Sequence, residues 1–160
     1  MLFLGMAVSY PTLIPGLRSP SDKVQGVVYF GRMLDKIRLF AAGKLPEGWH
    51  AARGTMMKGS FDSRCCRFLQ IEYADLEKET LKGRSDEEML EWAFTHGRRP
   101  TEDEIEVWNG FMTKRGWRDT GTQRLNERIQ RRVVRRLPDL RGKRSGKGWR
   151  LAGEAATFED

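Results

Sequence analysis

KVQGVVYFGRMLDKIRLFAAG, residues 23–43, is the longest segment of this chain with a clean helical period. Apolar residues recur every three or four positions and form one stripe: Val27, Phe30, Leu34, Ile37 and Ala41. The segment Ser19–Asp22 precedes it as a capping sequence, and Gly43 is placed to end it in the left-handed conformation. We therefore expect a long helix over Lys23–Gly43 at the centre of the hydrophobic core.

Charged residues gather in the second half of this stretch. Arg32 and Lys36 lie opposite the apolar stripe, and Asp35 and Arg38 lie towards one flank. Asp35 is spaced to pair with both Arg32 and Arg38 at i,i+3. Two interpretations stay open: a salt-bridged rim on a core helix, or a polar site beside the core.

Capping signals and glycines mark further helices along the chain. The expected helices span Phe61–Leu69 with Ser60 or Asp62 as N-cap, Asp75–Lys82, the segment from the Ser85 capping box to Gly97, the segment from the Thr101 capping box to Gly116, and Gln123–Leu137. No β-strand alternation of useful length accompanies them. The predicted fold is all-α: a single compact domain of about five or six short helices around one long N-terminal helix.

The composition indicates one domain with flanking segments. The chain has 160 residues, with five Trp and eight Phe available for a core. We predict an N-terminal arm over residues 1–17, the helical domain over residues 18–137 and a disordered tail over residues 138–160, where apolar residues are few and glycines many.

Positive charge is concentrated near the C-terminus. Residues 124–150 contain eleven Lys or Arg and two acidic residues, whereas the remaining chain has 18 basic and 20 acidic residues. Residues 124–150 therefore predict non-specific contact with nucleic acid through phosphates. No base-reading motif accompanies them, and Trp149 is the sole aromatic residue there, so sequence-specific recognition is not supported.

The cysteines and the N-terminal sequence indicate in which cellular compartment the protein is expected. Cys65 and Cys66 are adjacent and cannot link distant parts of the chain, which favours a reducing, cytoplasmic setting. The apolar N-terminus has no basic lead-in, is interrupted by Pro11 and is too short for a membrane span. We expect no association with a membrane.

Three residues are the best candidates for chemistry. Cys65 lies among arginines near a predicted helix N-terminus, a setting that lowers a thiol pKa, although free cysteines are more often buried. His50 stands beside Trp49 in a long loop over residues 44–60 and is a candidate acid or base. Asp35 is the third candidate. Neither histidine has a ligand-spaced partner, and the chain has no GxGxxG turn, so we expect neither a metal nor a cofactor.

Residues 108–119, WNGFMTKRGWRD, are dense in aromatic and cationic side chains. One interpretation is a core face followed by a glycine-capped turn; the other joins this block to the charged half of residues 23–43 around an anionic ligand. The candidate ligand-binding residues are Arg32, Lys36, Arg38, Asp62, Arg64, Asn109, Arg115 and Arg118.

Several blocks together resemble one bacterial family. LRSPSDKVQGVVYFGRMLDKIRLFAAGKLP, FDSRCCRFLQIEYADL, SDEEMLEWAF and EIEVWNGFMTKRGWRD occur in this order and are similar to domain-of-unknown-function family 5069, over roughly residues 15–125. The resemblance implies a compact helical protein without an assigned activity. It also implies an acidic region after the last block, where this chain instead has QRRVVRRLPDLRGKRSGKGWRLAG.

These observations leave three functional hypotheses. The first is a binding module for an anionic small molecule or a protein partner. The second is an enzyme that uses Asp35, His50 or Cys65 with arginines as charge stabilisers. The third is nucleic-acid association through residues 124–150.

Overall fold

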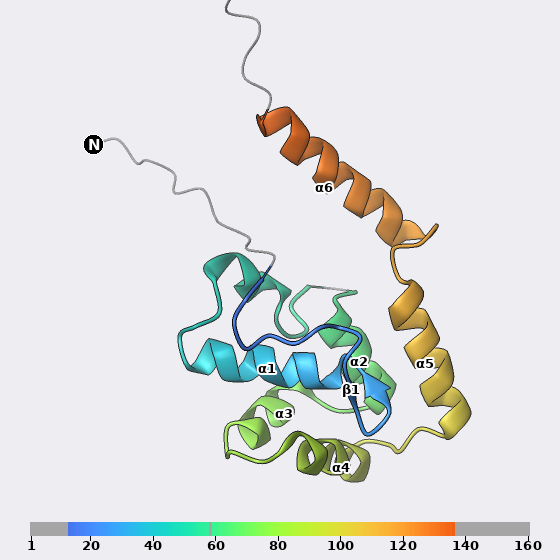
Figure 1. The fold of residues 1–160 in the computed structure, drawn as a ribbon. Helices are drawn as coiled ribbons and strands as arrows, with labels where there is room; N and C mark the ends of the chain where they lie inside the picture. Colours follow the sequence, from blue (N-terminus) through green and yellow to red (C-terminus); the bar gives the residue numbers. More distant parts are fainter. Residues whose placement is uncertain (1–12, 58, 137–160) are drawn as a thin grey trace, which may run out of the picture. The chain divides into compact units, whose positions relative to one another are not determined.

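The computed structural model describes residues 13–57 and 59–136, and the chain divides into two compact units, one ending at Arg115 and the other beginning at Gly116. In the described part, six α-helices, one 3-10 helix and a short two-stranded hairpin follow one another (Figure 1). The mostly helical fold class is confirmed. The tail predicted over residues 138–160, and most of the arm predicted over residues 1–17, lie outside the described residues.

The predicted long N-terminal helix is wrong in its first third, because that part forms a β-hairpin. Strand β1 (Lys23–Val24) pairs antiparallel with β2 (Val27–Val28). Gln25 and Gly26 connect them with φ of 43° and 88°. Positive φ at both central residues is what a tight two-residue hairpin turn requires, and glycine adopts it without strain.

Side chains from α5 (Glu102–Lys114) hold this hairpin in place. Val28 N–H donates to Asn109 Oδ1 at 3.1 Å, and Asn109 Nδ2 donates to the Gly26 carbonyl at 2.8 Å. Trp108 Nε1 donates to the Val28 carbonyl at 3.2 Å. A two-stranded hairpin is marginally stable alone, so contacts from residues about 80 positions away decide that these residues are not helical.

Helix α1 (Phe30–Ala41) starts after the hairpin, at Tyr29, whose φ is 73°. The Ser19–Asp22 segment does not cap a helix; its Ser19 N–H donates to the Asp22 carboxylate at 3.1 Å and closes a local turn. Gly43 follows the helix with φ of 65°, the left-handed conformation predicted for it. The helix is therefore shorter than predicted at its N-terminal end.

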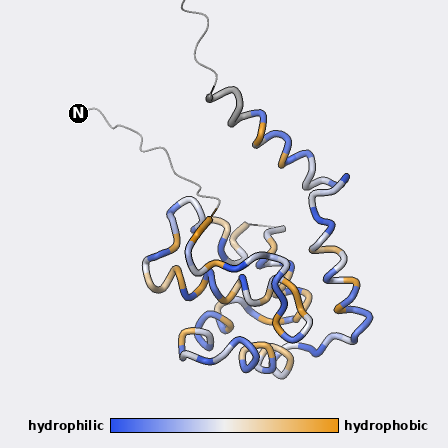
Figure 2. The backbone as a smooth tube through the Cα atoms, viewed as in Figure 1, coloured by the Kyte–Doolittle hydropathy of each residue, from blue (hydrophilic) through white to orange (hydrophobic). Residues whose placement is uncertain are grey.

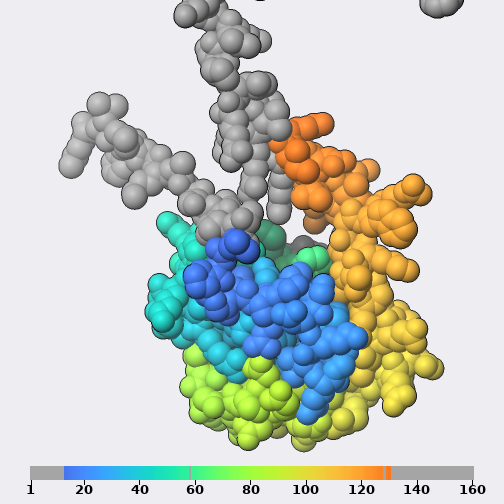
Figure 3. Space-filling model, in the orientation of Figure 1, coloured from blue at the N-terminus to red at the C-terminus, as the bar shows by residue number. Residues whose placement is uncertain are grey.

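The core of the first unit surrounds α1, which packs against α3 (Tyr73–Thr80) and α4 (Asp86–His96). In Figure 3 the blue surface of the hairpin region adjoins the yellow-green surface of α3 and α4. The predicted stripe is buried except at its end, where Ala41 is exposed. The largest fully buried apolar side chains are Phe30, Met33, Leu34, Ile37, Leu69, Leu76, Met89 and Leu90.

The remaining helices begin close to where their capping signals predict. Ser60 caps α2 (Phe61–Leu69), its hydroxyl accepting from Ser63 N–H at 3.1 Å. The capping boxes at Ser85 and Thr101 are both formed, at the starts of α4 and α5. The predicted loop over residues 44–60 contains the 3-10 helix η1 (Glu47–Ala52).

The second unit contains α6 (Thr120–Arg136). The Asp119 carboxylate accepts hydrogen bonds from Gly121 N–H at 2.7 Å and Thr122 N–H at 3.1 Å, at the first turn of this helix. Hydrophilic residues dominate α6, with apolar residues recurring among them (Figure 2). The helix predicted over Gln123–Leu137 is thus present and begins three residues earlier, at Thr120; its predicted last residue, Leu137, lies outside the described residues.

Candidate functional site

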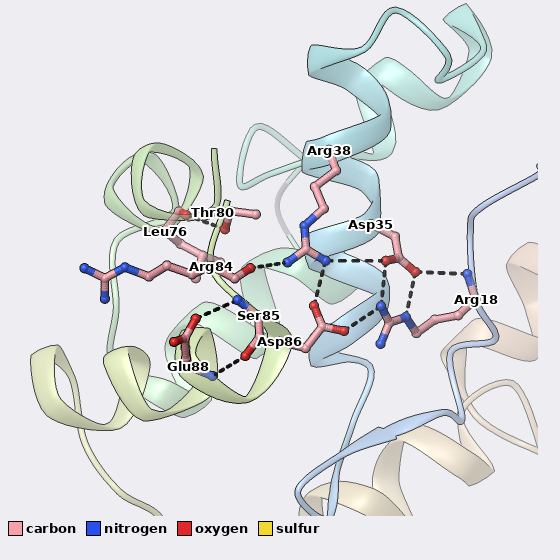
Figure 4. A network of polar contacts seen from close by, with 9 residues as sticks. All are labelled: Arg18, Asp35, Arg38, Leu76, Thr80, Arg84, Ser85, Asp86 and Glu88. Atoms are coloured by element: carbon pink, nitrogen blue, oxygen red, sulfur yellow. Dashed lines mark hydrogen bonds and ion pairs between the residues drawn. The ribbon is translucent and has the colours of Figure 1, made fainter. Parts of the chain in front are cut away.

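Four charged side chains form a network that joins the N-terminal segment to α1 and to the start of α4 (Figure 4). Arg18 binds Asp35 through two nitrogens, with Nε 2.7 Å from Oδ2 and a terminal nitrogen 2.8 Å from Oδ1. Arg18 and Arg38 each lie 2.6 Å from an oxygen of Asp86. Two guanidinium groups thus face two carboxylates, so the network is neutral and the charge of Arg38 is compensated.

Two residues of this network, Asp35 and Arg38, could be predicted from the sequence, and they lie 3.9 Å apart at the expected i,i+3 spacing. Arg18 and Asp86 were not predicted, because Arg18 lies 17 positions before Asp35 and Asp86 lies 48 positions after Arg38. No helical period connects residues at such separations.

Asp86→Asn is expected to destabilise the protein at neutral pH and much less in acid. Burial alone would raise the pKa of Asp86, but hydrogen bonds from Arg38 and Arg18 outweigh burial and lower the pKa below 3.8. A carboxyl group with a lowered pKa stabilises the fold above its unfolded-state pKa, and this contribution is lost as the pH falls through the folded-state pKa.

Urea unfolding of wild type and Asp86→Asn between pH 2.5 and pH 7 measures this dependence. The difference in unfolding free energy should shrink below about pH 4. Asp75→Asn, at an exposed carboxylate of α3, is the control and should change little at any pH. A difference that is constant across this pH range would contradict the assignment.

A second polar cluster is buried between α1 and α2, where Lys36 Nζ lies 2.5 Å from Asp62 Oδ1. The two side chains are 3% and 0% exposed. Nζ also donates to the Tyr29 hydroxyl at 3.0 Å and to the Ala52 carbonyl at 3.2 Å. An ammonium group has three protons to donate, so Lys36 has an acceptor for each.

Asp62 is equally well provided with donors. Its Oδ1 also accepts from the Tyr29 hydroxyl at 2.8 Å, and its Oδ2 accepts from Gly54 N–H at 2.7 Å. Burial lowers the pKa of Lys36, against the opposing effect of Asp62, and burial raises the pKa of Tyr29. Lys36 was predicted on the polar face of its helix; it is instead buried, because Asp62 from a different helix neutralises it.

The three candidate catalytic residues have separate surroundings. Cys65 is fully buried, and burial raises its pKa well above the ordinary value, opposite to the lowering expected of a nucleophile. His50 has Nε2 2.8 Å from the Leu45 carbonyl and lies edge-on to Phe40. Asp35 belongs to the ion-pair network. No described residue forms a hydrogen bond, an ion pair or a ring contact with more than one of these three residues.

An open, mostly apolar groove of about 490 Å³ lies between α2 and α5. Phe68 and Trp108 stack at its base with ring centroids 4.8 Å apart and planes inclined by 8°. Phe111 extends the aromatic surface, with its ring centroid 6.0 Å from that of Trp108. Val107 lines the groove with 73% of its surface exposed.

Three arginines lie over aromatic rings that line this groove, and one of them, Arg98, lines it directly. The guanidinium groups of Arg64 and Arg115 lie 5.4 and 5.7 Å from the centre of the Phe111 ring. Arg98 lies 5.6 Å from the Phe68 ring centre. Such cation–π contacts keep the charged groups beside the apolar surface.

Two of these arginines differ in whether a carboxylate neutralises their charge. Arg98 lies 2.7 Å from Glu104, which neutralises it. Arg64 donates Nε to the Gly59 carbonyl at 3.2 Å, a neutral partner. Over residues 13–57 and 59–136 no carboxylate forms an ion pair with Arg64. The groove therefore has an apolar base, with the cationic groups of Arg64 and Arg115 beside Phe111 at one end. The carboxylates of Asp103 and Glu104 line its other end.

The remaining predicted ligand-binding residues have other contacts. Arg32 donates to the Arg18 carbonyl and lies 5.4 Å from the Trp49 ring centre. Asn109 forms hydrogen bonds with the β1–β2 hairpin. Arg118 belongs to the second unit, where its guanidinium lies 5.9 Å from the Trp117 ring centre.

The described residues contain no group of three or more His, Cys, Asp or Glu side chains arranged to hold a metal ion. None of the helices in that part of the chain is both long enough and apolar enough to cross a membrane.

A family model described as a domain of unknown function, number 5069, matches residues 14–145. The match confirms the resemblance inferred from the sequence blocks and continues beyond residue 125, through α6. No curated protein and no solved structure matches the chain.

Proposed function

Because the chain belongs to domain-of-unknown-function family 5069, whose description assigns no activity, we propose its function from the surface: a binding module for a protein partner. The partner segment presents an apolar side chain to the groove between α2 and α5 and a carboxylate to its Phe111 end, beside Arg64. The uncompensated guanidinium of Arg64 over the half-exposed Phe111 ring carries this proposal.

The shape of the groove favours a peptide segment over a small molecule. Small-molecule sites enclose most of the ligand surface, whereas this groove is open along α5. An exposed valine beside stacked aromatic rings suits an aliphatic or aromatic anchor. A carboxylate next to that anchor can form a two-point hydrogen bond with a guanidinium group.

We also propose that the protein is bacterial and works in the cytoplasm. Two observations support the compartment: Cys65 and Cys66 are both free thiols and both are buried. Fractionation of cells expressing the tagged full-length chain tests the location, and recovery with the envelope would contradict it.

NMR titration of the ¹⁵N-labelled full chain tests the binding proposal with three 12-residue peptides of defined composition. Each peptide carries Leu and Phe anchors, surrounded by Glu in the first, Gln in the second and Lys in the third. The Glu peptide should shift signals of the groove residues and bind up to about fivefold more tightly than the Gln peptide, as expected for one exposed ion pair. The Lys peptide should bind most weakly.

Variants separate the two contributions to binding. Val107→Asp should weaken both peptides, the Glu peptide more because Asp also repels it, whereas Arg64→Gln should abolish the preference for Glu over Gln while leaving the Gln peptide affinity nearly unchanged. Met56→Asp and Lys44→Gln, at exposed positions outside the groove, are the matched controls. Equal affinity of the Glu and Gln peptides for the wild type, or an unchanged affinity of Val107→Asp, would contradict the proposal.

A further inference from the structure

Helix α6 combines an exposed apolar stripe with strong positive charge. Leu125 and Ile129 lie one turn apart, and their exposed fractions are 51% and 50%. Residues 120–136 contain six arginines and one glutamate, a net charge of +5. Isolated helices of this length are marginally stable in water, so a surface that covers the stripe would stabilise α6.

The charge of α6 determines which surfaces can cover it. Two copies of α6 packed side by side would bring two +5 segments together, and like charges at an interface are strongly unfavourable. A nucleic-acid backbone would satisfy the arginines but not the apolar stripe. The best partner is a protein surface that is both acidic and partly apolar.

The first unit has such a surface on α3 and α4. The stacked rings of Trp92 and His96, with centroids 4.5 Å apart, separate two adjoining grooves of about 530 and 370 Å³. We call this surface the acidic face; its carboxylates are Glu72, Asp75, Glu79, Glu87, Glu88 and Glu91. Residues 72–96 contain eight acidic and three basic residues, but Glu77 and Asp86 pair with arginines outside this range. The other six carboxylates and the three basic residues leave a net charge of −3, opposite in sign to that of residues 120–136.

Some of these carboxylates already have cationic neighbours. Asp75 lies 3.4 Å from Lys78, Glu79 contacts Lys82 and Arg84, and Glu91 contacts Arg99. In the part of the chain that the structure describes, Glu72, Glu87 and Glu88 form no ion pair. These three therefore contribute uncompensated negative charge on either side of Trp92.

We propose that α6 of one copy binds the acidic face of a second copy. Leu125 and Ile129 pack against Trp92, and the net positive charge of α6 complements the carboxylates around it. When each copy donates its helix to the other, two identical interfaces close a two-fold dimer. The acidic face is separate from the groove between α2 and α5, so this inference does not depend on the proposed function.

Sedimentation velocity of the full-length chain tests the proposal across protein concentrations at 50 mM and 500 mM NaCl. The wild type should form a concentration-dependent dimer at low salt, and the dimer should weaken at high salt because salt screens exposed charges. A wild type that is monomeric at every concentration overturns the proposal, including the case in which α6 binds its own first unit. Binding of a generic RNA or DNA duplex by such a monomer would favour the nucleic-acid hypothesis instead.

Two variants disable the two halves of the interface. Ile129→Asp acts on the apolar stripe, and the double substitution Glu72→Lys with Glu87→Lys acts on the acidic face. Each should raise the dimer Kd by about tenfold or more. The controls are Ile129→Leu, which keeps the stripe apolar, and Glu102→Lys with Glu106→Lys, which makes the same charge change on α5.

Mixing the two disabled variants gives the decisive result. One retains a functional acidic face and the other a functional α6, so an equimolar mixture should form a heterodimer through a single interface. Circular dichroism at 222 nm and the thermal midpoint verify that each variant is folded. Absence of the heterodimer, or a wild-type-like dimer in the acidic-face variant, overturns the assignment of these surfaces.

Discussion

Asp62→Ala is expected to lower the free energy of unfolding by about 3–5 kcal/mol, the usual cost of removing one partner from a buried ion pair. The substitution leaves the Lys36 ammonium with only the neutral Tyr29 and Ala52 oxygens as acceptors. It also removes the acceptor of the Gly54 N–H. Since whole domains are stable by about 5–15 kcal/mol, this is a large fraction of the total.

A double-mutant cycle measured by urea unfolding separates the interaction energy between Lys36 and Asp62 from the effect of each single substitution. Lys36→Met alone should also destabilise, because it leaves the Asp62 carboxylate buried without its cation. Lys36→Met combined with Asp62→Leu should recover much of the loss, since apolar replacement of a buried ion pair is often nearly neutral. A cost below about 1 kcal/mol for Asp62→Ala would place the pair among exposed salt bridges and contradict its burial.

Gly97→Ala is expected to cost about 3 kcal/mol or more, because the added methyl group has no room. A Cβ at Gly97 would lie 2.0 Å from the Leu69 carbonyl oxygen and 2.8 Å from that of Gln70. Both are backbone atoms, and the Leu69 carbonyl already accepts from Arg98 N–H at 2.9 Å. The ends of α2 and α4 would have to separate to accommodate alanine.

Gly110→Ala is the matched control for this prediction. A Cβ there meets nothing within 4 Å, and the residue lies inside α5, where alanine favours the helix by up to about 1 kcal/mol over glycine. The two variants should therefore shift the thermal midpoint in opposite directions. A Gly97→Ala protein as stable as the wild type would show that these helix ends do not meet as closely as described.

The helix boundaries set by capping could be predicted from the sequence, because a cap is a contact between residues three positions apart. The hydroxyls of Ser85 and Thr101 reach the backbone N–H groups of Glu88 and Glu104 within their own first turns. The same local reasoning placed α2 at residues 61–69. Family membership could also be inferred from the sequence, since ordered blocks of residues carry it.

The candidate site could be predicted only in part. Arg115 was singled out in a block dense in cationic and aromatic residues, and Arg64 as a charged neighbour of Cys65. Both lie over the ring of Phe111, which lines the groove between α2 and α5. Phe68 and Val107, which shape that groove, gave no signal in the sequence, because an apolar residue on a helix has the same pattern in a groove and in a core.

For residues 23–43, the sequence by itself determined the apolar stripe and the end of the helix at Gly43, both of which depend on local spacing and backbone preference. Only the tertiary structure decided that residues 23–28 form a hairpin, since Asn109 supplies hydrogen bonds that no neighbour in sequence can provide. It also decided that Lys36 is buried, because the free energy of burying a charge depends on whether a counter-charge such as Asp62 lies within reach.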